Sequence, residues 1–304
     1  MIYTVTFAPS IDYIPYVDDF QANTLNRAKE VSYYPGGKGI NISRVLKRME
    51  VDATALGFVG GFTGDYIQQF LQREQVPSAF IQVDSVTRIN VKIKSQQETE
   101  LNGPAPTLQS REIEQLLHFL QLHAKEDDWI VVSGSIPETV TDEFFEQLQK
   151  SCALTGAKWV LDTSGPRLKQ LLQYQPYFIK PNQHELGELV GDTIDTLEQA
   201  VAHAKKLTEQ DVSLVIVSLG GEGAVCVSSD TQFLAKAPKG QVVNTVGAGD
   251  SLVAGMVAQL AQQQSLQDAF RYGVASGSAT AFKEDLCHKE EVEKLVPQVE
   301  IQTI

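Results

Sequence analysis

Short apolar runs alternate with stretches of helical periodicity along most of this 304-residue chain. Consecutive apolar residues typical of buried strands occupy residues 2–7, 53–59, 129–133, 159–162, 177–179 and 214–218. Elsewhere, apolar residues recur at spacings of three and four, which is the period of an amphipathic helix. This period predicts a helix that begins near Lys38 and further helices over about 110–123, 141–154 and 197–208. The alternation indicates an α/β fold with a mainly parallel central sheet and helices on both faces.

Residues 11–34 and 87–103 depart from this alternation. The first segment is polar with β-like character, and residues 87–101 (TRINVKIKSQQETEL) predict a polar hairpin of two strands. Neither segment has the period of a helix. We expect the two to pair as a small separate sheet, suited to form a lid over a cleft, within a single domain of residues 1–304.

Polar and glycine-rich clusters follow several of the predicted strands. SGSIP follows Val132, DTSG follows Leu161, KPN follows Ile179 and SLGGEG follows Val217. Parallel sheets bind ligands at the carboxyl ends of their strands. The clusters therefore predict one shared cleft at that edge of the sheet.

The segment NTVGAGDS, residues 244–251, carries the sharpest chemical signal. Gly247 and Gly249 would let backbone N–H groups approach an anion, and the apolar residues that follow predict a helix whose N-terminus attracts negative charge. Asp250 would lie in the first turn, facing the same point. The alternative is a glycine-rich turn in which Asp250 only caps the helix.

The segment GGKGIN, residues 36–41, has similar physical properties. Its glycines permit close approach of the backbone to a ligand, Lys38 offers a point charge, and Asn41 offers both a donor and an acceptor. The segment lacks the GxxxxGK[ST] spacing of a Walker loop. A flexible loop at the start of a helix is the alternative interpretation.

Two further glycine or amide segments leave alternatives open. Asn182 and Glu185 lie three residues apart on a predicted helix, where they could hold waters around Mg²⁺. The same pair also fits a capping box at the start of that helix. The loop from Ser218 to Gly223 could line a nucleotide pocket or form a plain hairpin turn.

Basic residues near these segments are candidates for binding an anionic group. Arg88, Asn90 and Lys92 alternate along one predicted strand, so their side chains should share one face. Arg27 adds a further cation. For each of these residues taken singly, a solvated surface charge is the alternative.

Composition narrows the classes of function. A net charge of −13 argues against a surface for nucleic acid or for an anionic membrane. Cys152, Cys226 and Cys287 lie far apart, show no metal-binding spacing and fit a reducing compartment. No apolar run approaches 18 residues, and the N-terminal segment lacks the features of a secretory signal. We therefore expect a cytoplasmic location and no nucleic-acid or membrane partner.

Five separated segments together resemble a known family. GGKGINISR, SGSIP, KPNQHE, SLGGEGA and TVGAGDSLVAG occur in the order and spacing of the ribokinase-like, PfkB-type carbohydrate kinases. The resemblance covers essentially the whole chain. Four more segments, APSIDY, GFVGGFTGDYI, TRINVKI and ELNGPAP, are similar to the branch of that family that acts on phosphosugars.

The resemblance implies both a fold and a reaction. The fold would be a ribokinase-like α/β/α sandwich with a small β lid, and that lid would form a homodimer interface. The reaction would transfer a phosphoryl group from ATP, with Mg²⁺, to O6 of fructose 1-phosphate. Phosphorylation of tagatose 6-phosphate is the alternative within the same branch.

The resemblance also assigns roles by position. Asp250 corresponds to the catalytic base. The phosphoryl-stabilising positions are Gly247, Ala248, Gly249 and Lys38. The sugar-phosphate positions are Asp12, Gly37, Lys38, Asn41, Arg88, Asn90, Ser135 and Asp250. The ATP positions are Lys180, Asn182, Ser218, Leu219, Gly220, Gly221, Glu222, Gly223 and Gly249. The positions that organise Mg²⁺ through water are Asn182 and Glu185.

One position departs from the family pattern, and two other classes of function make different demands on the sequence. Many family members have Asp-Thr before the glycine turn, whereas this chain has Asn244-Thr245. A silent sugar-phosphate sensor on the same fold would not need the base Asp250. A nicotinamide-dependent dehydrogenase is excluded because no GxGxxG follows the first strand.

Overall fold

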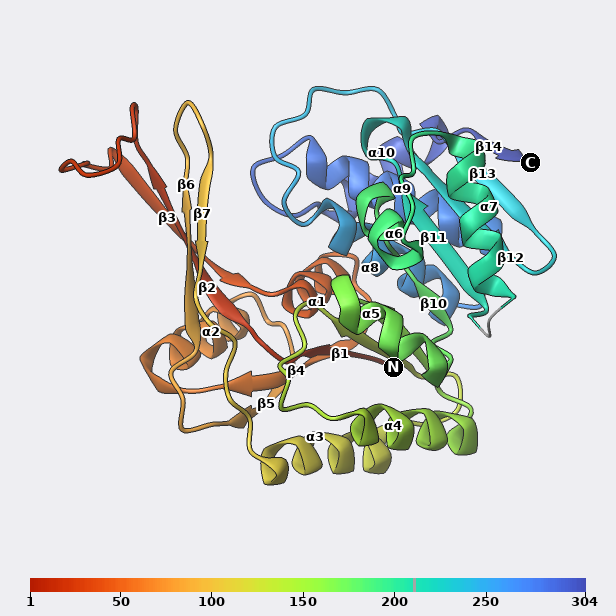
Figure 1. Cartoon of the computed structure of the whole chain (residues 1–304), viewed down its shortest axis with the longest axis horizontal. Helices are drawn as coiled ribbons and strands as arrows, with labels where there is room; N and C mark the ends of the chain where they lie inside the picture. The colour runs from red at the N-terminus through yellow and green to blue at the C-terminus, as the bar shows by residue number, and fades with distance from the viewer. Residues whose placement is uncertain (210–211) are drawn as a thin grey trace.

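The computed structural model describes residues 1–209 and 212–304. Its centre is a ten-stranded sheet with the order β14-β13-β12-β11-β10-β9-β8-β1-β4-β5 (Figure 1). The parallel strands are β1 (Ile2–Thr6), β4 (Ala53–Val59), β5 (Ser78–Gln82), β8 (Trp129–Ser133), β9 (Lys158–Asp162), β10 (Phe178–Ile179) and β11 (Leu214–Ser218). The antiparallel strands at one edge are β12 (Ala224–Ser228), β13 (Gln232–Ala235) and β14 (Ile301–Thr303). The predicted mainly parallel sheet is confirmed.

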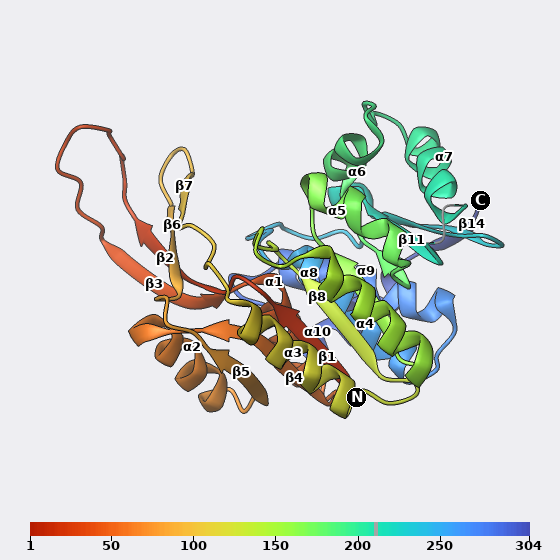
Figure 2. The ribbon, with the colours of Figure 1, turned by 60° about the horizontal axis from the view of Figure 1, so that its bottom comes forward.

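Helices cover both faces of this sheet, as predicted. Figure 2 shows α3 (Ser110–His123) and α4 (Asp142–Thr155) in front of the sheet, with α8 (Ala248–Ala261) and α9 (Leu266–Ala281) behind it. The remaining helices are α1 (Lys38–Arg48), α2 (Gly61–Arg73), α5 (Gly165–Leu171), α6 (Gln183–Val190), α7 (Leu197–Thr208) and α10 (Lys289–Leu295). Short 3₁₀ turns occupy Leu172–Tyr174 (η1), Gly220–Glu222 (η2) and Val296–Gln298 (η3).

Each face of the sheet has its own hydrophobic core. Phe145 of α4 and Leu186 of α6 belong to one cluster, while Val45 of α1 and Met256 of α8 belong to the other. The predicted helix near Lys38 begins at that residue, and its apolar stripe is fully buried. The helix predicted over 141–154 is shifted by one residue, because Thr141 adopts an extended conformation and occupies the N-cap.

A second, four-stranded sheet lies apart from the first, with the order β3-β2-β6-β7. Its strands are β2 (Ser10–Tyr16), β3 (Glu30–Gly36), β6 (Arg88–Ile93) and β7 (Thr99–Asn102). β2 pairs antiparallel with β3 and parallel with β6, and β6 forms the predicted hairpin with β7. Figure 1 shows this sheet projecting beside the central one. The prediction of a separate β-layer from residues 11–34 and 87–103 is therefore confirmed.

Within residues 1–209 and 212–304, no helix is a candidate membrane span. None of these helices combines the length and the apolar character needed to cross a bilayer.

Candidate active site

The carboxyl ends of β9, β10 and β11 meet the N-terminus of α8. Asp162 ends β9, Lys180 follows β10, and Ser218 ends β11. Because parallel strands present their carboxyl ends at one edge, residues far apart in sequence converge there. The polar residues that the sequence pattern assigned to the carboxyl ends of separate strands are therefore brought together at this edge.

Two glycines shape the first turn of α8. Gly247 has φ 81° and occupies the N-cap, where an added Cβ would lie 2.5 Å from Cδ2 of Leu286. A Cβ on Gly249 would lie 3.1 Å from Nζ of Lys180. Gly247 is therefore favoured by its backbone angle and by close packing, whereas a side chain at Gly249 would press against the end of Lys180.

The amides of this turn are not equivalent. The N–H of Ala248 donates to the carbonyl of Thr245 at 3.2 Å. The N–H groups that follow in the first turn, those of Gly249 and Asp250, lack an acceptor within the helix, as helix geometry requires. The N–H groups of Gly249 and Asp250 are therefore available to an anion at this turn, whereas that of Ala248 is already engaged.

Asp250 is a buried carboxyl held by a side chain of α1. It is 7% exposed, and Nδ2 of Asn41 donates to its Oδ2 at 2.8 Å. Burial, reinforced by the negative charge of Asp162, raises the pKa of Asp250 to about 6. The hydrogen bond from Asn41 and the charge of Lys38 act in the opposite direction. A carboxyl with such a pKa is suited to accept a proton near neutral pH.

Asp162 pairs with two lysines at the carboxyl end of β9, and the sequence pattern alone does not identify it as a site residue. Its Oδ1 lies 3.2 Å from Nζ of Lys38 and 3.6 Å from Nζ of Lys180. Burial acts to raise the pKa of Asp162, but the charges of Lys180 and Lys38 outweigh it and lower that pKa. Burial acts to lower the pKa of Lys38, but Asp162 and Asp250 raise it. Lys38 therefore stays protonated beside the reacting groups.

Asn182 and Glu185 form a capping box at the start of α6. The amide of Glu185 donates to Oδ1 of Asn182, and the amide of Asn182 donates to Oε2 of Glu185, both at 2.8 Å. One of the two interpretations left open by the sequence is thereby confirmed. Glu185 is also near enough to raise the pKa of Lys38.

The loop from Ser218 to Gly223 joins this region to the antiparallel edge of the sheet. Ser218 donates its N–H to the carbonyl of Pro181 at 3.1 Å, which ties the loop to the start of α6. The loop also turns β11 back into β12, so the hairpin interpretation is confirmed. Gly220 and Gly221 are exposed and have open space around them, so a ligand can approach their backbone.

A cavity of about 470 Å³ lies between the second sheet and the loops that precede α8 and follow α9. Asp12 of β2 and Lys92 of β6 line it as an ion pair of 3.0 Å. Asn90 donates to Oδ1 of Asp12 at 3.2 Å, and Asn41 also lines the cavity. A Cβ on Gly36 would lie 2.3 Å from Oδ1 of Asp12, so the glycine pair lets β3 pass close to this carboxylate.

Two further sugar-phosphate candidates, Arg88 and Gly37, are not among the residues that line this cavity. Arg88 donates to the carbonyls of Ala8 at 3.0 Å and Gly103 at 3.2 Å, so its guanidinium is held by the backbone. On the shared face of β6, the cation that lines the cavity is Lys92 and not Arg88. Gly37 has φ 122° and caps α1.

Ser135 is exposed in the loop after β8. The preceding residue, Gly134, lies next to Lys38, because an added Cβ would be 3.8 Å from the Lys38 amide. Asn244, the position that departs from the family pattern, donates to the carbonyl of Glu284 and accepts from the amide of Val246. Its side chain therefore organises the loop that leads into α8.

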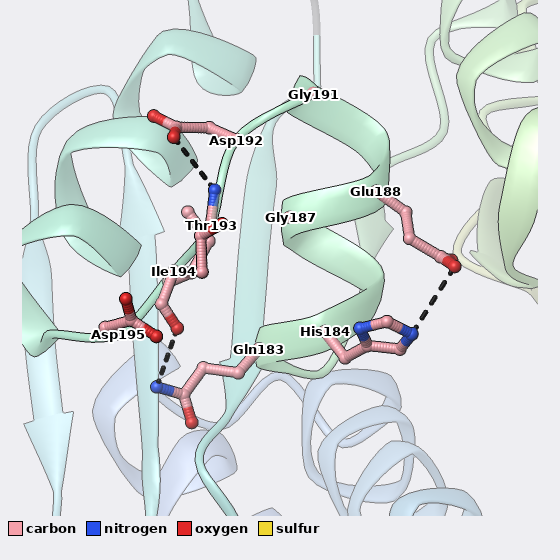
Figure 3. Close-up of a pocket in the computed structure, with 9 residues that line it drawn as sticks. All are labelled: Gln183, His184, Gly187, Glu188, Gly191, Asp192, Thr193, Ile194 and Asp195. Atoms are coloured by element: carbon pink, nitrogen blue, oxygen red, sulfur yellow. Dashed lines mark hydrogen bonds and ion pairs between the residues drawn. The ribbon is translucent and has the colours of Figure 1, made fainter.

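A larger cavity, of about 780 Å³, lies on the outer side of α6 (Figure 3). His184 and Glu188 form a 3.4 Å pair at one side of it, and Asp192 and Asp195 lie at the other. Its lining contains acidic side chains and no lysine or arginine. It is therefore unsuited to phosphate, in contrast to the region of Lys38 and Lys180.

The chain matches known proteins over nearly its whole length. The sequence profile of the pfkB family of carbohydrate kinases matches residues 3–292. The chain is 48% identical to a 1-phosphofructokinase of Bacillus subtilis, and the match covers 99% of each chain. It is 38% identical to a 1-phosphofructokinase of Borreliella burgdorferi, over 100% of this chain and 99% of that relative.

The fold has a solved counterpart. Phosphofructokinase-2 of Escherichia coli superposes with a TM-score of 0.91 at 31% identity, over 98% of each chain. It thus shares the mostly parallel sheet, the flanking helices and the ribokinase-like arrangement expected from the sequence. On the family match and these similarities, the chain belongs to the pfkB family of carbohydrate kinases.

Proposed function

We propose that this protein transfers the γ-phosphoryl group of ATP to O6 of fructose 1-phosphate. The observation that carries the proposal is Asp250, a buried carboxyl with a pKa of about 6 in the first turn of α8, hydrogen-bonded to Asn41. The pfkB family supplies the reaction class. The acceptor is inferred from the 1-phosphofructokinases that share 48% and 38% identity with the chain.

The proposed reaction uses Asp250 as the base. A carboxylate oxygen of Asp250 accepts the proton of the O6 hydroxyl as that oxygen attacks the γ-phosphorus. The bond from the γ-phosphorus to the bridging oxygen breaks, and ADP leaves with the electron pair. The amides of Gly249 and Asp250, with Lys38 and Lys180, stabilise the charge on the transferring group.

The nucleotide would lie across the carboxyl ends of β10 and β11. Lys180 is buried beside the α8 turn, and the Ser218–Gly223 loop presents exposed backbone. Together with Asn182, these groups could contact phosphates without displacing an apolar core. The support for this placement is the tie between Ser218 and the start of α6.

The carboxylate and amide oxygens near Lys38 also fit an Mg²⁺ ion that is held largely by water and substrate. Oδ2 of Asp162 is buried and has no hydrogen-bond partner among the described residues. Asn182 and Glu185 would contact the ion through water. The described ranges contain no group of three His, Cys, Asp or Glu side chains that could hold a metal alone. This fits Mg²⁺, which keeps several waters and binds through nucleotide phosphates. When bound, it would offset the negative charge of the phosphates.

The second sheet is proposed to act as a lid and as a homodimer interface. On its inner face, Asp12 and Lys92 line the cavity, and Asn90 donates a hydrogen bond to Asp12. Its other face exposes Tyr33, Ile89 and Leu101 at 51%, 41% and 70%. Apolar side chains in this number on a projecting sheet favour burial against another surface. Closure over the sugar would exclude water and limit ATP hydrolysis.

The test is a kinase assay with fructose 1-phosphate, tagatose 6-phosphate and fructose 6-phosphate under one condition, comparing kcat/KM. We expect fructose 1-phosphate to be preferred and ATP hydrolysis without sugar to be slow. A preference for tagatose 6-phosphate would reassign the acceptor. Turnover of free sugars alone would reject the phosphosugar assignment, and absence of any phosphotransfer would favour a sensor.

A further inference from the structure

Four charged side chains form a cluster behind the α8 turn, which we call the arginine clamp: Arg44 and Arg48 of α1, Glu74 after α2, and Asp285 after α9. Arg44 is only 2% exposed, and it donates to Glu74 through Nε at 2.7 Å and Nη2 at 2.8 Å. Its Nη2 also lies 3.1 Å from Oδ2 of Asp285. Arg48 completes the cluster, with Nη2 at 2.6 Å from Asp285 and 3.2 Å from Glu74.

The clamp is connected to the α8 turn through the loop of Asp285. Arg48 donates through Nη1 to the carbonyl of Leu286. The Leu286 side chain is 4% exposed and packs so closely on the N-cap that a Cβ on Gly247 would lie 2.5 Å from its Cδ2. The loop therefore forms the wall behind the first turn of α8.

The next residue of the loop attaches to α8 through buried hydroxyls. The amide of Cys287 donates to Oγ1 of Thr280 at 3.0 Å, and Thr280 shares a 2.7 Å hydrogen bond with Ser251. Ser251 directly follows Asp250. The loop thus contacts both the N-cap of α8 and the residue after the base.

One helix connects the clamp and the reacting groups. Lys38, Asn41, Arg44 and Arg48 are spaced by three, three and four residues along α1, so they share one face. The first turn of α1 contacts the reacting groups directly, since Asn41 binds Asp250. The later turns hold the Asp285 loop. The buried Arg44 and the partly buried Arg48 each pair with both carboxylates, which gives this connection a fixed geometry.

We infer that Arg44 and Arg48 are positioning residues, which act through Asp285 and Leu286 to hold the first turn of α8 for phosphoryl transfer. The inference rests on the proposed kinase function. Donors aimed at developing charge lower the barrier only when they are fixed in place, and small misplacements reduce rate more than binding. Loosening the loop should therefore lower kcat and leave the KM values nearly unchanged.

The test compares Asp285→Asn with Glu74→Gln. Each change is nearly isosteric and removes one carboxylate charge shared by both arginines, but only Asp285 lies in the loop behind α8. We expect Asp285→Asn to lower kcat on the order of ten-fold, with KM for ATP and sugar phosphate within about two-fold of wild type. Glu74→Gln should keep kcat within about two-fold of wild type, even if it lowers Tm as much as Asp285→Asn does.

The outcomes are separable from the proposed substrate, because kcat is measured on whichever sugar the wild-type protein phosphorylates best. Equal losses of kcat in the two variants would reduce the clamp to a stabilising cluster. A raised KM for sugar with unchanged kcat in Asp285→Asn would instead indicate direct substrate contact, since Asp285 lines the cavity. If Asp285→Asn fails to fold, Arg48→Met replaces it in the test, because this change removes the hydrogen bond to Leu286. A normal kcat in Arg48→Met would overturn the inference, and a lowered kcat would support it.

Discussion

At the scale of single residues, the position of Asp250 decides what the cleft can do. Its burial disfavours the charged form, and Asp162 adds a second negative charge nearby. Asn41, Lys38 and Lys180 oppose this effect, since each of them lowers the pKa of Asp250 and so favours its charged form. Asp250 therefore titrates where a general base is effective.

Replacement of Asp250 by Asn should retain the fold and ATP binding but lower turnover by roughly 10²–10⁴-fold, as expected for loss of a general base. The amide is close in size and can still accept the hydrogen bond of Asn41. Steady-state kinetics and a thermal melt of the same preparation provide the measurement. Near wild-type turnover in the folded variant would exclude Asp250 as the base.

The pH dependence of kcat/KM should show an acid limb near pH 6, because the base must be deprotonated in the free enzyme. Asn41→Ala removes a hydrogen bond that favours the charged carboxylate, so the pKa of Asp250 should rise and the limb should move to higher pH. The substrate phosphate also titrates near pH 6. Its contribution is common to both proteins, so an unshifted limb in Asn41→Ala would count against Asp250.

At the scale of elements, the N-terminus of α8 is defined by close packing as much as by its dipole. Gly249 lies against Lys180, and Gly247 lies against Leu286. Gly249 does not have the positive φ that characterises Gly247. Its requirement for glycine is therefore one of space, which a graded series of side chains can measure.

Gly249→Ala should lower kcat moderately, and Gly249→Val should lower it on the order of 10²-fold or more. The side chain would displace Lys180 and obstruct the approach of phosphate to the amides. Turnover and Tm are measured for both variants. Loss of kcat that increases with side-chain size, without matching loss of Tm, is the expected result. Normal turnover in a folded Gly249→Val protein would make the turn purely structural.

At the scale of the whole molecule, the projecting second sheet exposes apolar side chains that favour contact with another protein surface. Its exposed apolar face predicts a homodimer in solution. Leu101→Lys, at the β7 edge, should shift the protein toward monomer by placing a charge in the interface. Leu154→Lys is the matched control, because Leu154 is 88% exposed but lies on α4, which packs on the central sheet and not on the second sheet. Sedimentation across a concentration series checks both, and an equal effect of the two changes would reject the sheet as the interface.

The amino-acid sequence by itself determined the local elements and the types of chemistry available. Strand-like runs, helical periodicity and the polar alternation of Arg88, Asn90 and Lys92 predicted both sheets, because side-chain periods of two and about 3.6 residues are properties of local backbone geometry. The glycine turn before Asp250 was visible for the same reason. The starts of helices also follow from short-range patterns. So does the expectation that a ligand binds at the carboxyl ends of the parallel strands.

Only the tertiary structure decided which of these residues act together. Asp162 bridges Lys38 and Lys180, and Arg44 reaches Asp285, across sequence separations that no local pattern encodes. The pKa of Asp250 depends on burial and on charges from other elements. Ion pairing and desolvation depend on distances in space, and these are set by how helices pack on the sheet. The sequence therefore named candidates such as Asp250, Lys38 and Asn41, but it did not identify Asp162, and it could not give the charge states of these residues or their mutual contacts.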